Sequence, residues 1–152
     1  MSKNRYKSLA AVFAIILKDE QVLLQKRVNT GYKDGFYDLG TSGHLEENES
    51  LKEAMQRELS EELGLSVPLE NIQYSSMIHK NDNETGLVYI NVYFIITDFT
   101  GEPHIMEPEK NAELKWVSLN NLPENLIEDR KIALTNMSEG KAYMELGWND
   151  EK

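Results

Sequence analysis

Two stretches of sequence decide the fold of this chain: Gly43-His-Leu-Glu-Glu-Asn-Glu49 and, after seven further residues, Arg57-Glu-Leu-Ser-Glu-Glu-Leu-Gly-Leu65. The residues from Ser50 to Gly64 have the pattern of one helix. Ser50 can cap its N-terminus, and Glu53 three residues later can complete a capping box. Gly64 suits the left-handed position that follows the last helical residue.

One face of this helix is apolar. A rotation of about 100° per residue places five side chains on one stripe, which we expect to dock on a core. They are Leu51, Ala54, Met55, Leu59 and Leu63. Glu58 and Glu62 fall inside the same stripe, and Glu61 lies on its edge, one turn from Glu58. Three carboxylates therefore converge where a globular helix is normally apolar.

These clustered carboxylates predict a metal site. Holding three negative charges beside a low-dielectric core costs several kcal/mol per ion unless something compensates. A hard divalent cation does so, and oxygen-rich sites suit Mg²⁺ or Mn²⁺. The alternative is a solvated acidic helix face, which is disfavoured because the periodicity puts Glu58 and Glu62 on the wrong side for it.

The same residues resemble the Nudix box: Gly, five residues, Glu, seven residues, then Arg-Glu-Leu-x-Glu-Glu-x-Gly-Leu. Every specified position is filled between Gly43 and Leu65, so a chance match is improbable. The resemblance covers the box closely and the surrounding residues 8–132 more loosely. Nudix enzymes hydrolyse a nucleoside diphosphate linked to another group, and the resemblance implies that reaction here.

The resemblance also implies roles for individual residues. Glu58, Glu61 and Glu62 resemble the metal-binding carboxylates of the family, and Glu61 or Glu62 can also orient or deprotonate the attacking water. Glu49 and Arg57 resemble the ion pair that holds the loop of the box against its helix. We therefore expect all five residues to belong to the catalytic machinery.

Two local points stay open. Arg57 can also pair with Glu53, four residues earlier on the same helix. Gly43 lies where the backbone of the family turns tightly and a nearby carbonyl completes the metal shell. Many members have Pro-Gly-Gly here, whereas this chain has Gly40-Thr41-Ser42-Gly43, so the sequence does not identify that carbonyl.

The overall charge supports a role for metal. The chain has 16 Lys and Arg against 26 Asp and Glu, a formal net charge of -10, and should repel a polyphosphate. Metal ions reverse the local sign, bridge phosphate oxygens and activate water for in-line attack on phosphorus. The expected products are a nucleoside monophosphate and either pyrophosphate or the phosphorylated partner group.

Length and composition limit the other possibilities. The 152 residues, 40% of them hydrophobic, fit one domain over residues 1–152. The absence of cysteine excludes disulfides and thiolate chemistry. We see no signal peptide and no apolar run long enough to span a membrane, and we expect a cytoplasmic protein. The acidic balance disfavours duplex nucleic acid as a partner.

The pattern of elements predicts an α/β fold. We expect strands over residues 8–17, 22–27, 36–39, 72–79, 87–97 and 113–118, a loop over residues 40–49, and a second helix over residues 128–137. Strands on both sides of a central helix, with another helix near the end, favour a sandwich around a mixed sheet. The Nudix fold is similar, an α/β/α sandwich, although the strand order comes from the resemblance alone.

Three positions outside the box, together with Gly43 and His44 within it, are candidates for substrate binding. Arg27 ends a strand near the site loop, where similar proteins place a phosphate-binding residue; a surface Arg is the alternative. Phe36 or its neighbour Tyr37 can wall a base pocket, although core packing is the commoner role for an aromatic.

The remaining candidates are polar. Glu107 and Glu109 lie in a loop where related enzymes supply one more glutamate, and the sequence does not say which residue does so; solvated loop charge is the alternative. His44 follows the first glycine of the box and can approach phosphate. Trp116 follows a strand pattern and is expected to be structural.

Three functional classes compete. The first is the pyrophosphohydrolase. The second comes from residues 38–46, which loosely resemble isopentenyl diphosphate isomerases, but those enzymes rely on a catalytic cysteine. The third is a nucleotide-sensing module, in which box carboxylates are often lost, whereas they are intact here.

The substrate is the least determined property, because specificity lies outside the box. The small size and the lack of an added N-terminal domain favour a monomeric or homodimeric enzyme that acts on nucleoside triphosphates, including oxidised ones. ADP-ribose and other nucleotide sugars are the alternative. In either case the partner is a small-molecule nucleotide.

Overall fold

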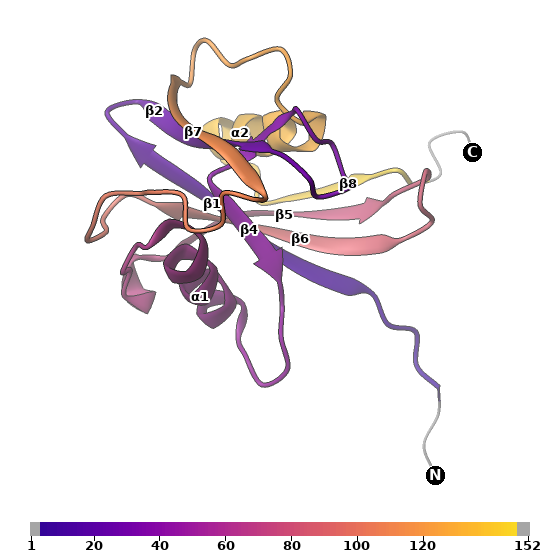
Figure 1. The fold of residues 1–152 in the computed structure, drawn as a ribbon. Coiled ribbons are helices and arrows are strands. Elements are labelled where there is room, and N and C mark those ends of the chain that lie inside the picture. The colour runs from indigo at the N-terminus through magenta and orange to yellow at the C-terminus, as the bar shows by residue number, and fades with distance from the viewer. Residues whose placement is uncertain (1–3, 149–152) are drawn as a thin grey trace.

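The computed structural model describes residues 4–148 of the chain (Figure 1). Within these residues it has eight strands, two α-helices and one short 3-10 helix. The strands are β1 (Leu9–Lys18), β2 (Gln21–Arg27), β3 (Tyr37–Leu39), β4 (Thr41–His44), β5 (Gln73–Asn81), β6 (Val88–Ile96), β7 (Asn111–Ser118) and β8 (Tyr143–Leu146). The helices are α1 (Leu51–Leu63), η1 (Leu69–Asn71) and α2 (Glu128–Glu139).

The strands form one mixed sheet in the order β3-β2-β1-β6-β5-β8, with β4 paired to β1 and β7 paired to β2. The pairs β1·β6 and β5·β8 are parallel, and the other pairs are antiparallel. Helix α1 covers one face of the sheet and α2 the other (Figure 1). The predicted α/β/α sandwich around a mixed sheet is confirmed.

Strand β1 lies at the centre and is apolar on both faces. Its residues from Ala11 to Ile16 are all buried, as expected for a strand covered by helices on both sides. Alternate side chains divide between two cores: Val12 belongs to the core beneath α1, and Phe13 to the core beneath α2. This strand therefore provides a rigid platform for both faces of the sheet.

Helix α1 has the caps that the sequence predicts. Ser50 Oγ accepts a hydrogen bond from the Glu53 N–H at 3.1 Å, and the Glu53 carboxylate accepts one from the Ser50 N–H at 2.9 Å. Gly64 adopts φ 68° just past the helix. Ala54, Met55, Leu59 and Leu63 are buried. The expectation for Leu51 is wrong: it is 36% exposed, because it is the first helical residue and lies next to the exposed end of the box loop.

Two elements differ from the expected pattern. Residues 41–44 were expected in a loop but form strand β4, because they pair with β1 from Ala14↔Thr41 to Ala11↔His44. Strand β8 was not expected, and it pairs in parallel with β5. The other expected strands and α2 are present within one or two residues of their predicted ends. Among residues 4–148 there is no helix with the length and apolar character needed to cross a membrane.

Candidate active site

Strand β4 and helix α1 bring the box residues together. Side chains of a strand alternate between its faces, and the pairing of Gly43 with Val12 and of Thr41 with Ala14 turns both residues toward α1. The Thr41 hydroxyl donates a hydrogen bond to Glu62 Oε1. A Cβ on Gly43 would overlap the carboxylate of Glu58.

Glu58 is largely withdrawn from solvent, with a side chain that is 12% exposed. Burial raises its pKa to about 7, and the nearby charge of Glu62 adds to this effect while Arg57 opposes it. A carboxylate that is costly to ionise in the metal-free protein gains most from a cation. Glu58 is therefore suited to bind a divalent metal.

Glu62 lies deeper along the same helix face. Burial raises its pKa, the hydrogen bond from Thr41 lowers it, and the charge of Glu107 raises it. The loop that carries Glu107 is attached to the end of α1, because the Met106 N–H donates to the Glu62 carbonyl at 3.2 Å and the His104 N–H donates to the Leu63 carbonyl at 3.1 Å. The structure thus brings a fourth carboxylate near Glu62.

Arg57 connects the loop, strand β4 and the helix. Its guanidinium binds both carboxylate oxygens of Glu49, at 2.7 and 2.9 Å, and donates to the His44 carbonyl at 3.1 Å. It also lies 3.2 Å from Glu58 Oε2 and 3.4 Å from Glu61 Oε1. The expected ion pair with Glu49 is present, whereas Glu53 serves the helix cap instead of pairing with Arg57.

Glu61 is the most accessible carboxylate of the box, with a side chain that is 52% exposed. Across residues 4–148, no three acidic or imidazole groups form a ready-made metal site. The donor set nevertheless fits a hard cation: Glu58, Glu61 and Glu62 offer oxygen atoms one helical turn apart, and two of them are partly desolvated.

The other expected substrate residues lie in different places. Arg27 binds the buried Asp38 at 3.1 Å and the Tyr32 carbonyl at 2.7 Å, so it is not a free surface arginine. Phe36 is 39% exposed, whereas Tyr37 packs in the core. Arg27 lies on β2 and Tyr37 on β3, whereas Phe36 lies in the segment that precedes β3.

His44 and Glu109 also lie outside the carboxylate cluster. His44 is on the opposite face of β4 from Gly43, with Nε2 3.3 Å from the Tyr89 hydroxyl. Glu109 is exposed. Trp116 is partly buried against the core beneath α1, which confirms its structural role.

A buried ionic network on the α2 face was not expected from the sequence. Asp38 is fully buried and accepts hydrogen bonds from Arg130 at 2.8 Å and Arg27 at 3.1 Å. Arg130 also donates to the Tyr93 hydroxyl at 3.0 Å and lies over the ring of Phe13. Burial raises the pKa of Tyr93 to about 12. Asp38 and Arg130 are 92 positions apart, so no local pattern could reveal the pair.

Thr41 was missed as well. The sequence shows that Pro-Gly-Gly is replaced here, but this difference was interpreted only as a question of which backbone carbonyl completes the metal shell. The side chain of Thr41 was not considered. The signal available was a hydroxyl two residues before the first glycine of the box.

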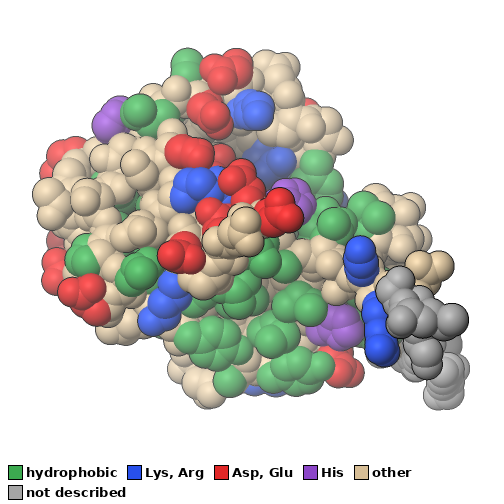
Figure 2. Space-filling view, turned by 90° about the horizontal axis from the view of Figure 1, so that it is seen from below, with side chains coloured by type: hydrophobic (Ala, Val, Ile, Leu, Met, Phe, Trp, Pro, Cys, Tyr) green, Lys and Arg blue, Asp and Glu red, His purple; other side chains and the backbone are tan. Residues whose placement is uncertain are grey.

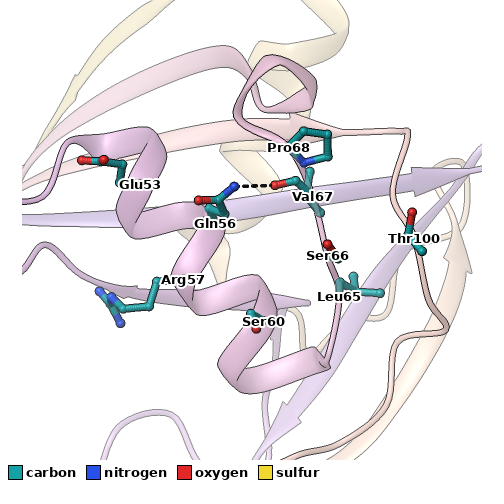
Figure 3. Close-up of a pocket in the computed structure, with 9 residues that line it drawn as sticks. All are labelled: Glu53, Gln56, Arg57, Ser60, Leu65, Ser66, Val67, Pro68 and Thr100. Carbon is teal, nitrogen blue, oxygen red and sulfur yellow. Dashed lines mark hydrogen bonds between the residues drawn. The ribbon is translucent and has the colours of Figure 1, made fainter.

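A groove also lies along another side of α1 (Figure 3). Its wall includes Gln56, whose side chain donates to the Val67 carbonyl at 2.9 Å. The residues that line it are Glu53, Gln56, Arg57, Ser60, Leu65, Ser66, Val67, Pro68 and Thr100. Because Glu58, Glu61 and Glu62 are not among them, this groove is distinct from the carboxylate cluster.

The surface near α1 is strongly charged. Figure 2 views the molecule from below, the side on which α1 lies in Figure 1, and shows acidic side chains gathered around basic ones. This agrees with the cluster around Arg57, where four glutamates lie within 4 Å of one guanidinium.

Comparison with known proteins agrees with this geometry. A family model described as the NUDIX domain matches residues 7–137. This chain belongs to the Nudix family. As a Nudix hydrolase it acts on phosphorus-containing anhydrides.

Two relatives and one solved structure illustrate the range of the family. An ADP-ribose pyrophosphatase from Methanocaldococcus jannaschii is 36% identical over 124 residues, which cover 80% of this Nudix hydrolase and 69% of the relative. Isopentenyl-diphosphate Delta-isomerase 2 from Photorhabdus laumondii is 32% identical over 127 residues, covering 76% and 70%. The crystal structure of a MutT NUDIX hydrolase from Burkholderia pseudomallei matches with a TM-score of 0.79 and 27% identity, covering 86% and 98%.

Proposed function

We propose that this Nudix hydrolase is a metal-dependent pyrophosphohydrolase that cleaves the diphosphate linkage of a nucleoside diphosphate derivative. The observation that carries the proposal is the position of Glu58 and Glu62. Both carboxylates are partly desolvated, lie one turn apart on α1 and face strand β4. Such an arrangement is costly without a cation and favourable with one.

Glu58, Glu61 and Glu62 would hold Mg²⁺ or Mn²⁺, and a carbonyl near Gly43 would complete the set of ligands. A divalent cation bound there supplies charge compensation for the phosphate oxygens and lowers the pKa of water. Glu107 is the better candidate than Glu109 for an additional carboxylate, because its charge acts on Glu62 whereas Glu109 is exposed.

The remaining residues position the site and move the proton. Arg57 holds Glu49 with two short hydrogen bonds and fixes the box loop to α1. Glu61 is the accessible carboxylate, and we assign it, with Glu62 as the alternative, to orient or deprotonate the water that attacks phosphorus. The products are a nucleoside monophosphate and the phosphorylated remainder of the substrate.

Two substrates deserve the first tests. ADP-ribose is supported by the 36% identity with an ADP-ribose pyrophosphatase. A nucleoside triphosphate, including an oxidised one, is the other candidate, because the complete box is equally consistent with it. Isomerase chemistry that uses a cysteine is not proposed, because the chain contains none.

A substrate panel tests the proposal. Purified protein is incubated with ADP-ribose, UDP-sugars, dinucleoside polyphosphates and ordinary and oxidised nucleoside triphosphates, each with Mg²⁺ or Mn²⁺, and the products are separated by ion-exchange chromatography. Release of a nucleoside monophosphate from one class is expected. A folded protein that turns over none of these substrates with either metal would overturn the assignment.

The proposal also covers the compartment, the ligand and the oligomeric state of the enzyme. We infer a cytoplasmic enzyme that acts on a small-molecule nucleotide as a monomer or homodimer. The net charge of -10 disfavours duplex nucleic acid as a ligand.

A further inference from the structure

We propose that Thr41 is a positioning residue for Glu62, whose Oε1 it holds so that the carboxylate keeps one orientation toward a divalent cation. The inference rests on the proposed function, because it assigns a task to a residue next to the proposed metal ligands. Thr41 lies outside the pattern that defines the box, and the proposal concerns its side chain alone.

The position of Thr41 is tightly fixed. It is fully buried, and its backbone is in register with Ala14 of the central strand β1. A threonine hydroxyl carries one proton, and this proton is donated to Glu62 Oε1. Strand β4 therefore presents the Thr41 hydroxyl to one oxygen of the carboxylate, and the backbone N–H of Ser42 is a second donor to the same carboxylate.

The spacing of residues along β4 matches the spacing along α1. This match explains why Glu62 and Glu58 of the helix lie against Thr41 and Gly43 of the strand. Two residues of a strand advance about 6.7 Å, and one turn of helix, four residues, advances about 6 Å. The contacts Thr41–Glu62 and Gly43–Glu58 follow these steps in opposite directions along the two elements. The strand thus offers a donor to one carboxylate and open space to the other.

The backbone of Glu62 is also immobilised. It is part of α1, and its carbonyl accepts a hydrogen bond from the Met106 N–H at 3.2 Å. The side-chain torsions are the freedom that remains, and the like charges of Glu58 and Glu107 push the carboxylate away from the site. The Thr41 hydroxyl opposes that push. Removing it should let Glu62 adopt several orientations, few of which are suited to the cation.

The donor comes from a residue that precedes the box pattern. Many Nudix members have Pro-Gly-Gly at the positions where this chain has Thr41-Ser42-Gly43. Neither proline nor glycine carries a side-chain donor. The Ser42 side chain does not duplicate the role, because Ser42 pairs with Phe13 and its side chain faces the other side of β4. Its backbone N–H does donate to Glu62, so the Thr41 hydroxyl is the side-chain donor of the pair.

A pair of variants tests the role. Thr41→Val removes the hydroxyl at nearly constant shape, and Thr41→Ser keeps it. For each protein we would measure kcat and KM with Mn²⁺, the Kd for Mn²⁺ alone by electron paramagnetic resonance without nucleotide, and the Tm. We expect Thr41→Val to lower kcat by about ten- to a hundredfold, as for the loss of a hydrogen bond to a charged group. The KM of the nucleotide should change little and the Kd for Mn²⁺ should rise.

Thr41→Ser should restore both quantities to within a few-fold of wild type. Wild-type kcat or tighter Mn²⁺ binding in Thr41→Val would overturn the proposal, and so would equal losses in both variants. If Thr41→Val does not fold, Thr41→Ala removes the same hydroxyl without adding bulk. If wild-type protein hydrolyses no nucleotide, the proposed function fails, while the Mn²⁺ affinities still decide the role of Thr41.

Discussion

Gly43 and Glu58 share a space that has no room for another atom. The glycine of strand β4 lies against the carboxylate of the helix, and a Cβ at this position would overlap that carboxylate. The contact explains why the box begins with a glycine in this chain: glycine is required here for close approach, and not for a left-handed backbone.

Replacing this glycine should damage catalysis more than folding. Gly43→Ala must displace Glu58, and displacement of a catalytic group by about 1 Å can cost on the order of a hundredfold in rate. We expect kcat/KM to fall by about that factor while the circular dichroism spectrum is unchanged. Wild-type activity in Gly43→Ala would show that Glu58 does not have to occupy this position.

The carboxylates of the box should be essential for turnover. We expect Glu61→Gln and Glu62→Gln each to lower kcat by about 10² to 10⁴, the usual contribution of a proton-transfer group, with the fold intact. Steady-state kinetics with Mg²⁺, alongside thermal melting of each variant, provide the measurement. Glu109→Gln is the matched control, because Glu109 is exposed. If Glu109→Gln lowered kcat as much as Glu62→Gln, then Glu109, and not Glu107, would be the additional carboxylate of the site.

The metal-free protein should lose stability as the pH rises through the range of Glu58. Burial raises the pKa of this residue from 4.5 to about 7. Between these values the folded state binds more protons than the unfolded state, so the free energy of unfolding falls with increasing pH. Solvent screening of this incompletely buried group keeps the effect below the roughly 3.4 kcal/mol of an unscreened shift.

This pH dependence can be measured by melting the metal-free protein in buffers from about pH 4.5 to about pH 8. Glu58→Gln should reduce the decline in Tm over this window, because it removes the titrating group. A variant with the same decline as wild type would mean that other carboxyls account for it.

Chelation should stop the reaction without unfolding the protein. Helix α1 has its own caps and its own buried side chains Ala54, Met55, Leu59 and Leu63, so its formation does not require a metal. After treatment with EDTA we expect no turnover and an essentially native far-ultraviolet circular dichroism spectrum, with activity regained on adding Mg²⁺. An unfolded metal-free protein would indicate a structural metal site instead.

The buried network around Asp38 should matter for stability. Arg130→Met leaves the fully buried Asp38 carboxylate with Arg27 as its remaining ionic partner. Breaking a buried ion pair on one side typically costs about 3 to 5 kcal/mol. Urea denaturation of the variant should show a loss of that order. A loss below about 1 kcal/mol, typical of an exposed pair, would contradict the burial of this network.

The local features of α1 could be predicted because they depend on neighbours in the chain. The Ser50 cap, the position of Gly64 and the buried face all follow from residues three or four positions apart. The prediction that Leu51 is buried was wrong, because the exposure of this side chain depends on where the helix starts relative to the sheet. The prediction of a loop at β4 was wrong, because Thr-Ser-Gly-His has no apolar alternation that would indicate a strand. These residues are extended because they pair with β1.

The resemblance of the box to the Nudix family was therefore sufficient to identify the reaction class. Helix periodicity, which is a local property, was sufficient to place the three glutamates within one helical turn of each other. Neither could predict the hydrogen bonds of Thr41 with Glu62 and of Asp38 with Arg130, or the effect of the Glu107 charge on Glu62. These pairs join separate elements, and their distances depend on strand register and on how α1 and α2 pack against the sheet. Register and packing are set by the burial of the whole core, which no short stretch of sequence encodes.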